Sequence, residues 1–328
     1  MPREMRRCWT GLALVVLLSL PAAGRAATCT AQAELSAQDR SALAGLGGRL
    51  AEAVVQQDEA ALHAALLPAE AAEWSGIQGA IEQAGPLVKG GQIQLRNLYL
   101  LDASTMTAPA DTQFFCSNGN GTLTVTITMH ALPPGRYAVV LADAAGAPLA
   151  GQLGLILAWD GAAWRLAGLS AHQGVFDGHD GVWYWARARG LAKVDPWSAS
   201  YSYDAARYLL LPLDFISSPN LDKLHQEQAA IQGGPQDVFP YSVTAGDRTW
   251  KIDAVVLDPS LHQADLAVVY ESTGVTDPAA QRTEAIAVFT AFLKAQPGLR
   301  QNFHGLWAYA VKDGKRTPVM ELPMGQIP

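Results

Sequence analysis

The sequence predicts an α+β protein in which helices pack on a curved antiparallel sheet, followed by a helical-hairpin bridge and a small ββαββ domain. Three observations support this fold class. Apolar residues recur at helical spacing over residues 36–84, apolar and polar residues alternate over residues 93–170, and two aromatic-rich helical segments precede a final mixed region. A repeat near 3.6 residues is typical of an amphipathic helix, and a repeat of two is typical of a half-buried strand.

The amino-terminal helices are expected over residues 36–57, 59–67 and 71–84. Ser36 stands three positions before Asp39, a spacing close to that of a capping box. Asp58 is suited to cap the second helix. Pro68 is expected to end that helix, and Gly85-Pro86 to end the third.

Six strands are expected after the helices, near residues 93–99, 112–116, 123–129, 137–142, 153–159 and 164–170. Asp160-Gly161 separates the last two strands and is a frequent two-residue hairpin turn. Helices followed by an antiparallel meander indicate that the helices pack on one face of the sheet.

This first region, residues 33–172, resembles the nuclear transport factor 2-like (cystatin-like cone) domain. The likeness lies in VVQQDEAALHAALLP, residues 54–68, and in the closing hairpin LAWDGAAWRLAGLSAH, residues 157–172. An enzyme of this fold needs an acid or base on an inward strand or at the mouth of the cone, and burial there raises the pKa of a carboxyl group. The candidate catalytic residues on this basis are Asp102, Tyr99 and His130.

The bridge, residues 177–232, is expected to hold helices over residues 181–193, 197–211 and 219–231. The first two resemble a single tetratricopeptide hairpin, with Trp183 on the first helix, Ala199, Tyr203 and Ala206 on the second, and Pro212 after it. Since one repeat cannot bury a solenoid core, the pair is expected to pack on its neighbours. Its aromatic residues Trp183, Trp185 and Tyr201 are candidates for stacking against a sugar or peptide.

Gly233-Gly234-Pro235 predicts a domain boundary, and residues 236–328 follow as the ββαββ domain. Strands are expected over residues 250–257, 266–270, 306–311 and 318–322, with a helix over residues 278–296. The segment TDPAAQRTEAIAVFTAFLKAQPGLRQNFHGLWAYA with the closing ELPMGQIP resembles secreted bacterial proteins to which no activity is assigned, so this resemblance implies no mechanism.

Residues 1–26 have the pattern of a cleavable signal peptide: early arginines, an apolar run from Trp9 to Leu20, and small residues Gly24 and Ala26 before the expected cut. This pattern predicts a periplasmic or secreted protein, with no integral membrane segment after cleavage. The leader contains four Arg and one Glu, so its removal changes the net charge from −7 to −10. A nucleic-acid partner is therefore disfavoured, and no cofactor is predicted.

Two cysteines remain after cleavage, and an oxidising compartment favours a Cys29–Cys116 disulfide. The alternative is two independent thiols. The junction between the first region and the bridge contains His172, Asp177 and His179, which are candidate ligands for a divalent metal, although their spacing matches no established metal motif.

The function favoured by these features is non-catalytic: an exported protein that binds a partner protein or an apolar small ligand in the cone or along the bridge. A cone-fold isomerase, dehydratase or hydrolase is one alternative, and an architectural envelope component is another. Fold alone does not decide among them, because function depends on particular sites.

Overall fold

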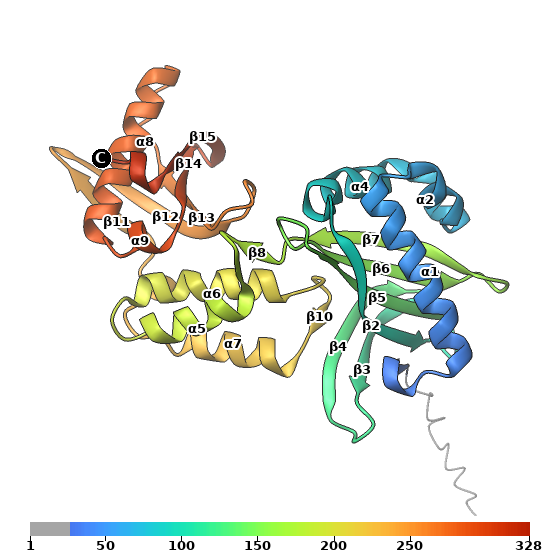
Figure 1. Ribbon diagram of the computed structural model, residues 1–328. Helices are drawn as coiled ribbons and strands as arrows, with labels where there is room; N and C mark the ends of the chain where they lie inside the picture. The colour runs from blue at the N-terminus through green and yellow to red at the C-terminus, as the bar shows by residue number, and fades with distance from the viewer. Residues whose placement is uncertain (1–26) are drawn as a thin grey trace, which may run out of the picture.

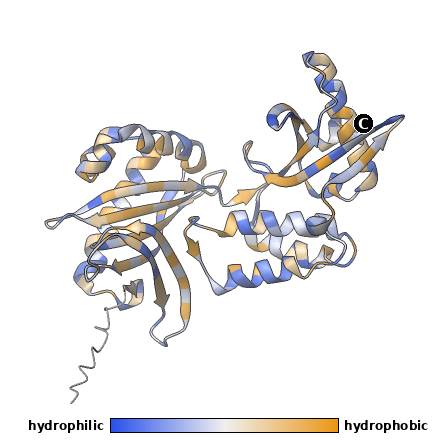
Figure 2. Ribbon diagram, turned by 180° about the vertical axis from the view of Figure 1, so that it is seen from behind, coloured by the Kyte–Doolittle hydropathy of each residue, from blue (hydrophilic) through white to orange (hydrophobic). Residues whose placement is uncertain are grey.

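The computed structural model describes residues 27–328, except for the side chain of residue 237, and the predicted leader lies outside this range. The fold class is α+β, as predicted, with two five-stranded sheets that flank a helical bridge (Figure 1). Figure 2 shows hydrophobic stretches along strands of both sheets, whereas the bridge helices alternate hydrophilic and hydrophobic stretches.

The amino-terminal sheet is antiparallel and has the order β1-β2-β5-β6-β7. Its strands are β1 (Thr28–Ala31), β2 (Gln92–Asp102), β5 (Arg136–Ala145), β6 (Gln152–Trp159) and β7 (Trp164–His172). One face is covered by α1 (Ala37–Gln56), α2 (Glu59–Ala65), α3 (Pro68–Ala72) and α4 (Trp74–Val88). The Ser36 and Asp58 side chains cap α1 and α2 as the sequence predicts.

The third predicted helix extends beyond its expected end. Gly85-Pro86 lies inside the last turn of α4, and the helix continues to Val88. The missing amide of Pro86 removes only one helical hydrogen bond there. Burial of Leu87 and Val88 against the sheet favours the extra turn.

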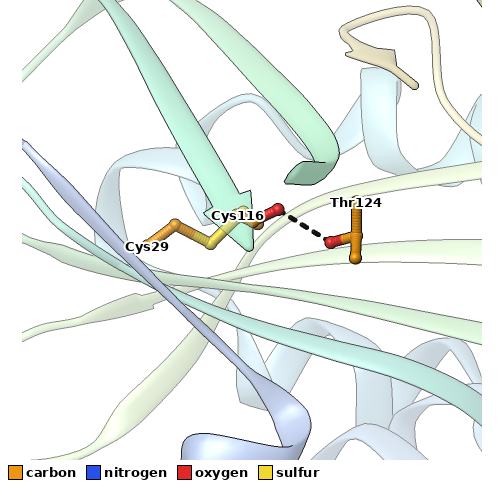
Figure 3. The surroundings of a disulfide bond; sticks show 3 residues. All are labelled: Cys29, Cys116 and Thr124. Carbon is orange, nitrogen blue, oxygen red and sulfur yellow. Dashed lines mark hydrogen bonds between the residues drawn. A yellow bond between two sulfur atoms is a disulfide. The ribbon is translucent and has the colours of Figure 1, made fainter. Parts of the chain in front are cut away.

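A separate three-stranded sheet, in the order β10-β4-β3, covers the opposite face. It consists of β3 (Ala110–Ser117), β4 (Leu123–Leu132) and the short β10 (Ile216–Ser217). The predicted disulfide is present: Cys29 on β1 is bonded to Cys116 on β3, and the Thr124 hydroxyl donates a 2.7 Å hydrogen bond to the Cys116 carbonyl (Figure 3). The bond ties this second sheet to the edge of the first.

The bridge begins with a small hairpin, β8 (Val175–Phe176) and β9 (His179–Asp180), and continues with α5 (Gly181–Leu191), α6 (Pro196–Leu210) and α7 (Pro219–Ala229). Asp180, Asp195 and Ser218 accept hydrogen bonds from backbone amides in the first turns of these helices. The chain returns to the second sheet between α6 and α7, where Ile216 pairs with Ile127. Bridge and amino-terminal region are therefore joined through both the chain and a strand pair.

The carboxy-terminal sheet has the order β11-β12-β13-β14-β15, so it has one strand more than predicted. Its strands are β11 (Tyr241–Ala245), β12 (Arg248–Asp258), β13 (Asp265–Glu271), β14 (Gly305–Lys312) and β15 (Lys315–Pro323), and its helices are α8 (Pro278–Ala295) and α9 (Leu299–Asn302). Because α8 and α9 connect β13 to β14, these two strands are parallel. One apolar cluster joins bridge residues such as Trp197 and Tyr201 to Phe292 of α8, so the segment at residues 233–235 connects elements that share a core.

Candidate functional site

The interior of the amino-terminal domain is filled by apolar side chains. They come from the helices and from the facing sheet, and they include Leu43, Leu50, Val54, Leu62, Ile81, Val88, Val140, Leu155 and Leu157, all buried. A ligand between the helices and this sheet would have to displace packed side chains. The cavities of the protein lie at the surface of this domain, in the bridge and at the junction with the carboxy-terminal sheet.

The three candidate catalytic residues lie at separate places. Tyr99 is buried on β2, where burial raises the pKa of its phenol, and it borders a cavity of about 380 Å³ that Arg40 and Asn118 also line. Asp102 ends β2 and accepts hydrogen bonds from the Ser104 amide (2.9 Å) and hydroxyl (2.6 Å). Burial acts to raise the pKa of Asp102, but these hydrogen bonds outweigh it and lower the pKa. The Asp102 side chain therefore stabilises the turn that follows β2.

His130 is 77% exposed and lies 3.2 Å from Asp111. It lines a cavity of about 350 Å³ that Asp214 and Phe215 also border. Neither Tyr99 nor Asp102 lines this cavity. The structure thus does not combine these residues into one acid–base site.

Two of the three candidate metal ligands, Asp177 and His179, lie at the same cleft, and His172 does not. Asp177 lies at the β8–β9 turn with a positive φ of 50°, and the His179 ring stacks on Trp183 with centroids 3.8 Å apart. Asp177 and His179 line one cleft of about 310 Å³ with His304. His172 is directed elsewhere: its ring stacks on Tyr208 at 4.8 Å, and burial lowers its pKa.

A titratable cluster that the sequence did not predict borders the same cleft. Asp265 begins β13, His304 directly precedes β14 and Glu321 lies on β15. The His304 Nδ1 and Asp265 Oδ1 atoms are 2.8 Å apart, and one ligand atom from each of the three side chains lies within 4.8 Å of the others. These are the residues best placed to hold a metal ion in the described part of the chain. A sequence signal exists only for Asp265, a carboxylate at the start of the apolar run Leu266–Tyr270.

The candidate ligand-binding aromatics have different environments. Tyr201 is buried between Trp197 and Phe303, so its ring is used in core packing. The Arg187 guanidinium lies over the Trp183 ring, 4.9 Å from the ring centroid. Trp185 is partly buried and donates a 2.8 Å hydrogen bond from Nε1 to Glu227.

Glu227 is the polar centre of a groove between the three bridge helices, which we call the bridge groove. The groove encloses about 680 Å³ and is lined by Arg189, Ala192, Lys193, Tyr203, Glu227, Ala230, Ile231 and Gln232. The Arg189 guanidinium donates to both Glu227 oxygens (2.7 and 2.8 Å), and the Tyr203 hydroxyl donates at 3.3 Å. These donors, Arg189 foremost, lower the pKa of Glu227 to about 2.

Comparison with protein-family models, curated proteins and solved structures finds no match for this chain. The resemblances to a cystatin-like cone and to a tetratricopeptide hairpin therefore stay predictions. No helix among residues 27–328 has the length and apolar character required to cross a bilayer.

Proposed function

We propose that this chain is an exported, non-catalytic protein that binds a peptide segment of a partner protein in the bridge groove. The observation that supports this proposal is the groove itself, whose volume of about 680 Å³ lies within the range of roughly 300–1,000 Å³ that is common for ligand sites.

The groove has a wall that is held in place before any ligand arrives. Glu227 on α7 accepts hydrogen bonds from Trp185 and Arg189 on α5 and from Tyr203 on α6. Gln228 strengthens the α6–α7 contact, since its Nε2 donates to Asp204 at 2.7 Å. A preformed wall favours binding because fewer side chains lose conformational freedom when the ligand is bound.

The lining indicates the chemistry of the partner segment. Ala192, Ala230 and Ile231 supply small apolar surfaces, and Lys193 lies at the same groove. Val194, next to Lys193 in the chain, is 78% exposed. Apolar surface beside a cation fits a peptide in which an apolar side chain neighbours an aspartate or glutamate.

The exported location is supported by the disulfide between Cys29 and Cys116, because such bonds persist in oxidising compartments. The leader pattern of residues 1–26 and the acidic balance of the remaining chain agree with a periplasmic or secreted protein. We also propose that the bridge hairpin is tetratricopeptide-like, with α7 as the third helix that completes its groove.

Selection from a displayed peptide library tests the proposal. Peptides selected on the wild-type protein are expected to share an apolar residue beside an acidic one, and to lose at least tenfold in affinity for the Ile231→Arg variant. The matched control is Val256→Arg, which places the same charge on an exposed apolar residue of β12. Peptides that bind the Ile231→Arg variant as tightly as the wild type would refute the proposal.

A further inference from the structure

Three ligand-type side chains converge at one end of the carboxy-terminal sheet. Asp265 starts β13, His304 precedes β14 and Glu321 lies on β15 opposite Trp307. The parallel pairing of β13 with β14 and the antiparallel pairing of β14 with β15 place these positions on adjacent strands. Their candidate ligand atoms all lie within 4.8 Å of one another. Ligands bound tetrahedrally at about 2.1 Å are about 3.4 Å apart, so the three side chains would close in slightly around a bound ion.

Gly305 keeps open the space between the two carboxylates. A Cβ atom at this position would lie 2.7 Å from Glu321 Oε1 and 2.9 Å from Asp265 Oδ1. Such distances are shorter than van der Waals contact, so any side chain at residue 305 would enter the space that the two carboxylates share. The absence of a side chain thus lets both acidic groups approach the same point.

Two oxygen atoms of the cluster are buried without a donor among the described residues. They are Asp265 Oδ2 and Glu321 Oε1, and the Asp265 side chain is wholly buried. Burial of an oxygen atom that accepts no hydrogen bond is unfavourable, and it is more so when the group carries charge. These oxygens therefore need a proton or a cation.

The charges that surround the cluster are mostly negative. The carboxylates of Asp258 and Asp177 add negative charge near Asp265. A divalent cation between Asp265 and Glu321 would satisfy both of their donor-free buried oxygens at once.

We propose that Asp265, His304 and Glu321 form a binding site for a divalent transition-metal ion of the zinc class. An imidazole nitrogen with two carboxylate oxygens suits Zn²⁺, whereas Mg²⁺ and Ca²⁺ prefer ligand sets made of oxygen alone. The ion would join three adjacent strands of the sheet.

The cleft in front of His304 gives the ion a route from solvent. The His304 side chain is 35% exposed, and Asp177 and His179 line the same cleft. Water in this cleft, or the Asp177 carboxylate, would supply a fourth ligand. The predicted metal ligands Asp177 and His179 thus border the site, while its ligands come from the carboxy-terminal sheet.

Calorimetric titration of Zn²⁺ into the full chain, purified without a polyhistidine tag and stripped with chelator, tests the proposal. We expect one equivalent to bind, and we expect His304→Ala and Glu321→Gln each to weaken binding at least tenfold. The controls are Glu271→Gln, at the exposed far end of β13, and His130→Ala, which removes the exposed histidine beside Asp111. Both controls should bind Zn²⁺ as the wild type does.

Unfolding temperatures of the metal-free proteins separate loss of ligand from loss of fold. His304→Ala should unfold within a few degrees of the wild type, because its side chain is partly exposed. The visible absorption of bound Co²⁺ provides a second readout, expected in the wild type and lost in a folded His304→Ala variant. No Zn²⁺ binding by the wild type, or binding that survives in His304→Ala and disappears in His130→Ala, would overturn the proposal.

Discussion

The guanidinium of Arg189 and the carboxylate of Glu227 form a bidentate ion pair that joins α5 to α7 along the bridge groove. Arg189 also lies over the ring of Trp185, 4.3 Å from its centroid. The pair thus links two helices that both line the groove. Groove geometry and bridge stability should therefore change together when either residue is replaced.

Replacement of Glu227 by alanine removes the shared acceptor of Arg189, Trp185 and Tyr203. We expect urea unfolding to show a loss of about 1–2 kcal/mol, since partly exposed ion pairs contribute up to ~1 kcal/mol and the indole and phenol donors add to it. Asp143→Ala is the control, because the Arg96–Asp143 pair is longer (3.7 Å) and exposed. Equal losses for Glu227→Ala and Asp143→Ala would contradict this prediction.

The contribution of Glu227 should depend on pH in a defined direction. Its pKa in the folded protein is about 2, below the ordinary value of 4.5. A depressed pKa in the folded state stabilises the protein above the unfolded pKa, and this stabilisation is lost as the pH falls through the folded value. The difference in unfolding free energy between the wild type and Glu227→Gln should thus be constant near neutral pH and shrink between pH 4.5 and about 2. A difference that stays unchanged over this interval would show that the pair does not hold the carboxylate ionised.

Loss of the disulfide should destabilise the whole amino-terminal domain. Cys29 and Cys116 are 87 residues apart in the chain, and a closed loop of that length contributes about 4–5 kcal/mol in the chain-entropy estimate. The double variant Cys29→Ser, Cys116→Ser should unfold at markedly lower urea concentration than the oxidised wild type. Reduced wild type should behave as the double variant does, and an unchanged midpoint in both would refute the prediction.

A buried carboxylate in the carboxy-terminal domain should be among its most sensitive residues. Glu284 on α8 accepts hydrogen bonds from the Trp250 indole (3.2 Å), the Ser272 hydroxyl (2.8 Å) and the Thr273 amide (3.0 Å). Glu284→Ala leaves these donors without their acceptor, so we expect a loss of about 3 kcal/mol or more in urea unfolding. Glu271→Ala, on an exposed part of β13, should change stability by less than ~0.5 kcal/mol. A loss for Glu284→Ala as small as that of the control would contradict the assigned network.

Local signals in the sequence were sufficient to predict most elements of the fold. Ser36 and Asp58 each cap the helix that follows them, because a capping side chain needs only the amides two or three residues ahead. The turn at Asp160-Gly161 is likewise stabilised by residues that are close in the sequence. Asp160 accepts hydrogen bonds from the amides of Ala162 and Ala163. The α+β class followed from these local patterns.

Contacts between distant segments could not be predicted in the same way. β10 pairs with β4 across 89 residues, and no periodicity within two residues of strand indicates that partner. Asp265 and His304 meet only because α8 and α9 carry the chain back to a parallel strand. The groove around Glu227 likewise requires three helices to pack, so the sequence indicated Trp185 as a candidate and gave no sign of its acceptor.

The most direct test of the central claim is photo-crosslinking in cells that produce the protein. A benzoylphenylalanine residue at Gln232, which lines the bridge groove, should yield a discrete crosslinked partner, and the additional substitution Ile231→Arg should abolish it. The same probe at Thr317, on the exposed part of β15, should yield none. No adduct at residue 232, or equal adducts at residues 232 and 317, would contradict partner binding in the groove.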